Sequence, residues 1–148
     1  MLAIIHDRCR PLLFFKIFTW GTRLLLFLAF LPSGYKKLAG LRFTSLGIES
    51  PIGFFFEALF RSGYYWNFLG LMQLTAGVLL LVPRTATFGA LLYLPIIVNI
   101  LVIVCSMHFS GTPVIVGLML MAVLYLLLWD WPKLNRIGTI LFEKDRNP

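Results

Sequence analysis

Hydrophobic residues gather in four long runs in this chain, and most polar residues stand between the runs. The runs extend from Leu12 to Gly34, Tyr64 to Val82, Ala86 to Met107 and Pro113 to Trp131. Each is close to the roughly 20 apolar residues that a helix needs to cross the hydrocarbon core of a membrane. The pattern predicts four membrane-spanning helices in a single domain covering residues 1–148.

The connections between the runs indicate how the helices pack. The turns Val82–Thr85 and Ser110–Pro113 are so short that the helices they join must be antiparallel neighbours. We therefore expect an all-α, integral membrane four-helix bundle with short tails. Ile52–Phe60 is too short to span but too apolar for an ordinary loop, which predicts a short interfacial or re-entrant helix between the first two spans. Because Ser33–Lys36 is a poor cleavage site, we expect the first span to remain in the mature protein.

Composition and charge support a membrane protein. The chain is 59% hydrophobic and 13% charged, whereas soluble domains average about 45–50% and about 25%. This excludes a disordered chain and argues against a soluble monomer. The net charge of +7 does not indicate nucleic-acid binding, because the basic residues lie at the termini and between apolar runs.

The basic residues outside the runs predict the orientation in the membrane. Eight of them fall on the side of the termini and four on the opposite side. By the positive-inside rule both termini are expected in the cytoplasm.

Arg23 stands near the middle of the first run, where a charged side chain costs between about 3 and more than 10 kcal/mol. One interpretation is that Arg23 reaches back to the cytoplasm from a shifted span. The other is that it faces the bundle interior and has polar partners there. At 100° per residue, Gly34 and Lys37 lie on the same stripe of the helix as Arg23.

Two other spans carry amides among apolar residues. Gln73 lies between Gly70 and Gly77 on a stripe of small residues, which lets membrane helices approach closely. Asn99 follows Pro95 by one turn, and Pro95 leaves a backbone carbonyl without its helical donor. Each amide is either part of a shared polar cluster or satisfied locally.

Depth favours the cluster. With a rise of about 1.5 Å per residue, Arg23 lies about 16 Å below Gly34, while Gln73 and Asn99 lie about 13 Å and 12 Å below the ends of their spans. Tyr125 on the fourth span comes slightly deeper. We predict that these polar residues line one ligand pocket, with a quinone or a lipid as the expected ligand.

The predicted pocket has candidates for a mouth and a cover. His108, at the end of the third span, is either a polar helix terminus or a residue at the pocket mouth. Glu57 either faces the lipid headgroups or folds inward to meet Arg23 or Lys37, so Glu57 and Lys37 are candidate cover residues.

The sequence offers no redox or metal centre. No group of His, Cys, Asp and Glu has the spacing of metal ligands, and the predicted topology places His6 and His108 on opposite sides of the membrane. Cys9 and Cys105 are too far apart for a CxxC pair. We expect no metal and no covalent cofactor.

The order of these features resembles the DoxX family of small four-span bacterial membrane proteins. The resemblance begins with Arg23–Leu28, Gly34, Lys37-Leu38 and Gly40. It continues with the second span at Gly70–Gly77 and the basic hairpin turn at Pro83–Ala86, and it covers roughly residues 20–131. It implies a multi-pass protein of the bacterial inner membrane.

The family name derives from a subunit associated with a thiosulfate:quinone oxidoreductase, which implies a quinone-related role. Many members have Glu where this chain has Gln73, so an Arg–Glu pair is replaced here by Arg23 and a neutral amide. We expect a subunit or quinone- or lipid-binding partner of a membrane oxidoreductase, without a redox centre of its own. The alternatives are a non-catalytic lipid-binding or membrane-complex assembly protein, and a small oligomeric transporter. A homo-oligomer is compatible with each.

Overall fold

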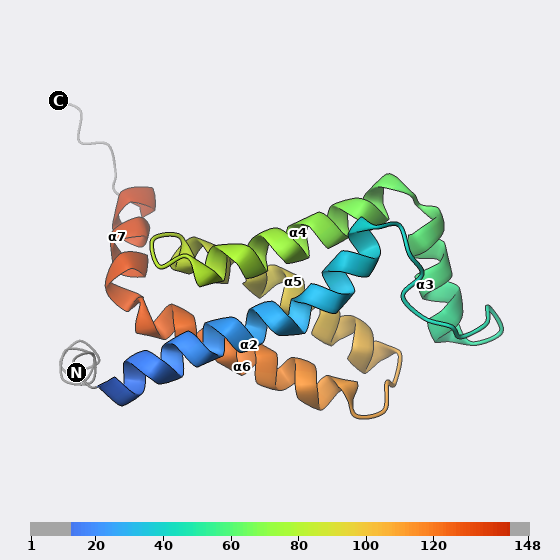
Figure 1. Cartoon of the computed structure of the whole chain (residues 1–148), viewed down its shortest axis with the longest axis horizontal. Coiled ribbons are helices and arrows are strands. Elements are labelled where there is room, and N and C mark those ends of the chain that lie inside the picture. The colour runs from blue at the N-terminus through green and yellow to red at the C-terminus, as the bar shows by residue number, and fades with distance from the viewer. Residues whose placement is uncertain (1–12, 143–148) are drawn as a thin grey trace.

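The computed structural model describes the backbone of residues 13–142 and the side chains of residues 13–140. Within this part every regular element is a helix, as predicted. Four helices run side by side: α2 (Leu13–Leu38), α4 (Tyr64–Leu81), α5 (Ala86–Ser106) and α6 (Thr112–Trp129). At one end of this bundle lies α3 (Pro51–Arg61), and at the other α7 (Trp131–Phe142) (Figure 1). We call these the α3 end and the α7 end.

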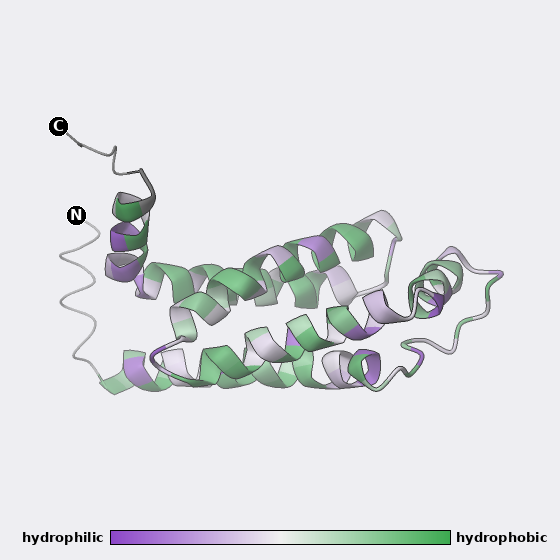
Figure 2. Cartoon of the chain, turned by 90° about the horizontal axis from the view of Figure 1, so that it is seen from above, coloured by the Kyte–Doolittle hydropathy of each residue, from purple (hydrophilic) through white to green (hydrophobic). Residues whose placement is uncertain are grey.

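Three of the helices, α2, α5 and α6, are long and apolar enough to cross a membrane. Most residues of these helices are hydrophobic (Figure 2), and at most 28% of the residues in their apolar segments are buried in the bundle. Many of their large hydrophobic side chains are therefore exposed on its outside. Apolar surface of this extent is typical of contact with lipid. The helix α4 matches the predicted second run but is not one of the three. Asn67 and Gln73 lower its hydropathy.

Close packing of α2 against α4 depends on glycines at their interface. A Cβ atom at Gly70 would lie 2.6 Å from the carbonyl oxygen of Gly34, and one at Gly34 would lie 2.9 Å from the side chain of Leu74. Gly70, Gln73 and Gly77 are all buried. The predicted small-residue stripe therefore faces the bundle, as membrane helices use such stripes for close approach.

Two boundaries differ from the sequence predictions. The first helix continues four residues beyond Gly34 and ends at Leu38. The second is at the predicted C-terminal tail, where a further helix, α7, follows α6 almost directly. Pro132 prevents α6 from continuing, since proline has no N–H and its ring clashes with the preceding turn. The carbonyl of Asp130 then accepts the first N–H groups of α7, from Lys133 and Leu134.

The predicted short helix between the first two runs is present as α3. Ser50 caps it by accepting a hydrogen bond from the N–H of Gly53, and Pro51 occupies its first turn, where a missing N–H costs nothing. Two side chains of α4 hold the preceding loop: Trp66 donates to the carbonyl of Leu41 and Asn67 to that of Leu38. These contacts fix the start of the loop that leads to α3 against α4.

Candidate functional site

The candidate site is a cavity of about 490 Å³ in the α3-end half of the bundle. Its walls come from α2, α4, α5 and α6, and α3 contributes Phe55, Phe56 and Leu59. Near the turn between α4 and α5 the two helices touch, because a Cβ atom at Gly89 would lie 2.8 Å from the backbone of Leu80. Farther from this turn both helices contribute to the cavity wall, α5 from Pro95 to Val104. The cavity therefore occupies the wider end of a hairpin that is tight only at its turn.

Among the described residues, Lys37 is the one charged residue that lines this cavity, and the other lining residues are mainly apolar. Its side chain is buried, with the residue 7% exposed. The Nζ atom donates to Gln73 Oε1 at 2.8 Å and to Ser33 Oγ at 2.6 Å. It also lies 5.1 Å from the ring centre of Phe43 and 5.4 Å from that of Trp66, within the range of cation–π attraction.

No carboxylate among residues 13–140 forms an ion pair with Lys37. Its partners are neutral oxygens and aromatic faces, which stabilise the ammonium group but leave its charge uncompensated. A buried charge is normally paired because removing it from water is costly. The cavity wall thus presents a positive charge inside an otherwise apolar space.

The two predicted amides both line this cavity. Gln73 is 3% exposed and its Oε1 atom accepts from both Lys37 and Ser33. Asn99 has its side chain accessible and makes no hydrogen bond within the described part of the chain. In a membrane the amide of Asn99 would need a polar partner, because lipid tails offer none.

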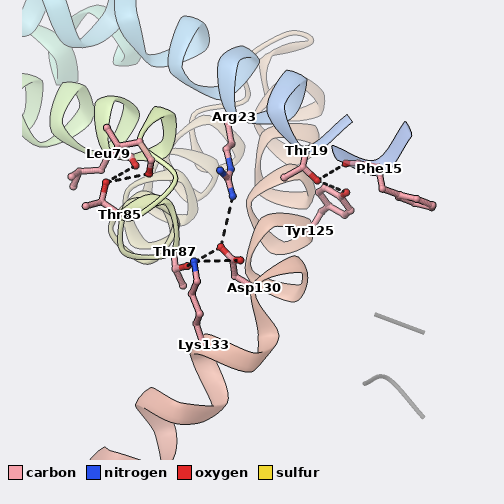
Figure 3. Close-up of polar contacts among 10 residues, drawn as sticks. Phe15, Thr19, Arg23, Leu79, Thr85, Thr87, Tyr125, Asp130 and Lys133 are labelled. Atoms are coloured by element: carbon pink, nitrogen blue, oxygen red, sulfur yellow. Dashed lines mark hydrogen bonds and ion pairs between the residues drawn. The ribbon is translucent and has the colours of Figure 1, made fainter. Parts of the chain in front are cut away.

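A second polar cluster lies at the α7 end and is centred on Asp130 (Figure 3). Arg23 Nη2 lies 3.8 Å from Asp130 Oδ2, and both side chains are more than nine-tenths buried. Thr87 donates to the same oxygen at 2.8 Å, and Lys133 Nζ lies 3.7 Å from Oδ1. The cluster joins α2, α5, α6 and α7 through one carboxylate. The Nε atom of Arg23 is buried and has no hydrogen-bond partner in the described part of the chain.

The prediction that Arg23 shares a pocket with Gln73 and Asn99 is wrong. A Cβ atom at Gly34 would lie 3.3 Å from Gln73 Cβ, so Gln73 is level with Gly34. Arg23 lies eleven residues farther along α2, which is about 16 Å at the rise of an α-helix. The predicted depths assumed that α2 ends at Gly34 and that the ends of all the spans lie at the same level. In the structure α2 continues to Leu38, and α4 is shifted along α2 so that Gln73 lies beside Gly34.

Tyr125 also lies away from the cavity. Its hydroxyl forms a 2.9 Å hydrogen bond with Thr19 Oγ1, near the α7 end (Figure 3). The ring packs against Phe18 and Trp129. Its position therefore fits an aromatic layer at that end of the bundle.

Glu57 pairs with arginines of its own end of the bundle and meets neither Arg23 nor Lys37. It accepts from Arg42 Nε at 2.9 Å and from Arg61 Nε at 2.8 Å. The hydrogen bonds from Arg42 and then Arg61 lower the pKa of the Glu57 carboxyl below its usual range. Glu57 lines a separate cavity of about 340 Å³ between α3 and the loop before it. The ion pair with Arg42 joins that loop to α3, so Glu57 stabilises the segment that lies over the end of the bundle.

His108 lies just beyond α5, exposed and outside the lining of the 490 Å³ cavity. Its φ of 54° is in the left-handed region that non-glycine residues rarely adopt. The neighbouring Phe109 does line the cavity and its ring packs against that of Phe56. The turn that contains His108 thus brings Phe109 into contact with α3.

Asp130 and Thr87 were missed by the sequence reasoning. Asp130 stands between Trp129 and Trp131, directly after an apolar run. An acid at that place could have been recognised as a partner for the buried Arg23. No three His, Cys, Asp or Glu side chains gather as a metal site among the described residues. His6 and Cys9 lie outside them, and Cys105 is exposed on α5.

Comparisons with known proteins are limited to one segment. No protein-family model matches the chain, and no solved structure matches it. The chain is similar to a Bacillus subtilis (strain 168) protein named "Uncharacterized protein YwoB", with 52% identity over 42 residues. These residues make up 28% of this chain and 27% of that protein. The similarity therefore spans about a quarter of that relative.

Proposed function

We propose that this protein crosses the bacterial inner membrane four times and binds a lipid-soluble molecule, a quinone or a lipid, in the 490 Å³ cavity. The observation that carries the proposal is the cavity itself, which has apolar walls and a few polar groups on α2, α4 and α5. Ligand pockets commonly have about 300–1,000 Å³ and combine apolar walls with a few polar groups that orient the ligand.

The membrane part of the proposal rests on the outer surface of the bundle. Three helices are apolar enough to span, and α4 packs between α2 and α5 over a length of 18 residues. We propose that α4 is the fourth span, with Asn67 near the membrane surface and Gln73 shielded from lipid by Lys37 and Ser33. A polar residue inside a span is tolerated where it faces the bundle and is paired.

Within a larger system, we propose the role of a quinone- or lipid-binding partner or subunit of a membrane oxidoreductase. The support is the DoxX resemblance of residues 20–131 and the cavity. In this role the partner would supply the electrons. A non-catalytic lipid-binding or assembly role is the second candidate. The amide of Asn99 lines the cavity and has no hydrogen-bond partner among the described residues, and a lipid headgroup would satisfy it without any redox chemistry.

Filling the cavity should displace the ligand. Met119 lines the cavity, whereas its neighbour Leu118 is 66% exposed on the outside of α6 and does not line it. Met119→Trp is expected to lower the amount of co-purified lipid-soluble ligand at least about tenfold, since an indole occupies the space of a ligand group. Mass spectrometry of the organic extract of purified protein measures this.

Leu118→Trp is the matched control and should retain the ligand, because it adds the same side chain outside the cavity. A wild-type extract without any enriched quinone or lipid, together with no binding of added decylubiquinone or oleate, would reject the proposed function.

The orientation of the bundle can be tested by cysteine labelling. The turn between α4 and α5, which contains Arg84, lies at the same end of the bundle as α7, which contains Lys133 and Arg136 (Figure 1). We propose that this end faces the cytoplasm. In a chain without its two native cysteines, Ser45→Cys should react with a membrane-impermeant maleimide in intact cells. Asn147→Cys should react only after the membrane is opened. The reverse pattern would show the opposite orientation.

A further inference from the structure

The chemistry of the cavity narrows the class of ligand, and this inference rests on the proposed function. We propose that the cavity binds a single-chain amphiphile with a carboxylate head, such as a long-chain fatty acid. The carboxylate contacts Lys37 and the hydrocarbon chain follows the apolar walls.

The head group is assigned from the charge of Lys37. Its ammonium group is buried, lines the cavity and has no carboxylate partner among residues 13–140. Ser33 and Gln73 accept two of its three N–H groups. A neutral carbonyl, as in a quinone, would accept the third N–H but leave the charge. A carboxylate would accept it and also cancel the charge, which gives the buried ammonium group the ionic partner that it lacks.

A carboxylate fits better than a phosphate monoester. Within the described chain Lys37 is the one charged residue lining the cavity, so a single negative charge balances the site. Phosphate sites commonly use Arg, whose fork of donors matches several oxygens, and no described Arg lines this cavity. Asn99 lines the same cavity without a hydrogen-bond partner in the described chain, and its amide is a second donor for a ligand oxygen.

The tail is assigned from the remaining walls. From Lys37 and Ser33 the lining continues along α2 to Phe30 and Ala29, and across α5 and α6 to Ile97, Val116 and Met119. These side chains have no polar group. Such walls accommodate a flexible hydrocarbon chain without demanding hydrogen bonds from it.

The test compares oleate with methyl oleate, which has the same chain and a neutral head. Purified full-length protein in nanodiscs of phosphatidylcholine is titrated with each, and binding is measured by displacement of a fluorescent fatty acid. We expect oleate to bind at least about tenfold more tightly than methyl oleate. Lys37→Gln should abolish that preference, while Lys36→Gln should retain it, because Lys36 is exposed.

Other outcomes are distinguishable. Equal affinity of wild-type protein for oleate and methyl oleate would overturn the carboxylate assignment without any variant having to fold. Tighter binding of lysophosphatidate than of oleate would overturn it in favour of a phosphate head. Binding of decylubiquinone but not oleate would overturn it while leaving the proposed function standing. Binding of none of these probes would reject both.

Discussion

Arg23→Ala is expected to lower the free energy of unfolding by about 3–5 kcal/mol, the usual cost of removing one partner from a buried ion pair. Arg23 and Asp130 are each more than nine-tenths buried. Without the guanidinium, Asp130 loses a buried cation, and Lys133, which is half exposed and lies 3.7 Å from Asp130 Oδ1, compensates a buried charge less well. Thermal and SDS-induced unfolding of the purified protein in detergent would measure the loss.

Three further variants distinguish the buried Arg23–Asp130 ion pair from the more exposed Lys133–Asp130 ion pair. Lys133→Ala should cost no more than about 1 kcal/mol, because solvent screens exposed ion pairs and the Lys133 side chain is 47% exposed. Arg23→Lys should also be destabilising, since a point charge cannot replace the planar fork of Arg. Combining Arg23→Met with Asp130→Leu should restore part of the stability, because both members of the buried pair are then replaced by apolar side chains.

If Arg23→Ala were as stable as the wild type, the ion pair would contribute nothing. Arg23 would then be better described as a residue that reaches water at the α7 end.

Gly70→Ala is expected to separate α2 from α4 and to disturb the cavity at the same time. A Cβ atom at this position would lie 2.6 Å from the Gly34 carbonyl oxygen and 2.8 Å from Lys37 Cβ. The first obstacle is backbone, so it cannot rotate away, and the helices must move apart. Overpacking of this kind typically costs about 1–3 kcal/mol. Because Lys37 is displaced from Gln73 by the same movement, the affinity for oleate should fall as well.

Gly117→Ala is the matched control for Gly70→Ala. Gly117 lies within α6, and a Cβ atom there would meet nothing within 4 Å. Alanine is the better helix former by up to about 1 kcal/mol, so this variant should be as stable as the wild type or slightly more stable. Unfolding in detergent and oleate binding should be measured on both variants. A Gly70→Ala protein with unchanged stability and affinity would mean that α2 and α4 are not packed as closely as described.

Local signals in the sequence were enough to predict most helices. The Val82–Thr85 turn separates two apolar runs, and the structure has α4 ending at Leu81 and α5 beginning at Ala86. The apolar stretch Ile52–Phe60 predicted a short helix, and the structure has α3 at Pro51–Arg61. The spacing of Gly70, Gln73 and Gly77 correctly predicted the buried face of α4. Each of these features depends on neighbours within a few residues, which is why sequence alone reveals them.

Local sequence signals did not predict which distant residues form pairs. Asp130 lies more than 100 residues from Arg23 in the sequence, and only the packing of α2 against α6 brings them together (Figure 3). The register between α2 and α4 depends on where glycines allow contact, and it separated Arg23 from Gln73 by about 16 Å along the helix. Arg23 and Lys37 lie on one buried stripe of α2, as the periodicity predicted.

Periodicity and composition were sufficient to predict a helical chain, the helices with long apolar surfaces, and the polar residues on them that must be shielded from lipid. The tertiary structure alone decided that Arg23 belongs to an ion-pair cluster at the α7 end and Lys37 to a cavity at the α3 end. The physical reason is that periodicity specifies the face of a helix, whereas the axial register between two helices is set by side-chain volumes on both. At this interface those volumes come from Gly34, Gly70 and Leu74, residues that lie up to 40 positions apart in the sequence.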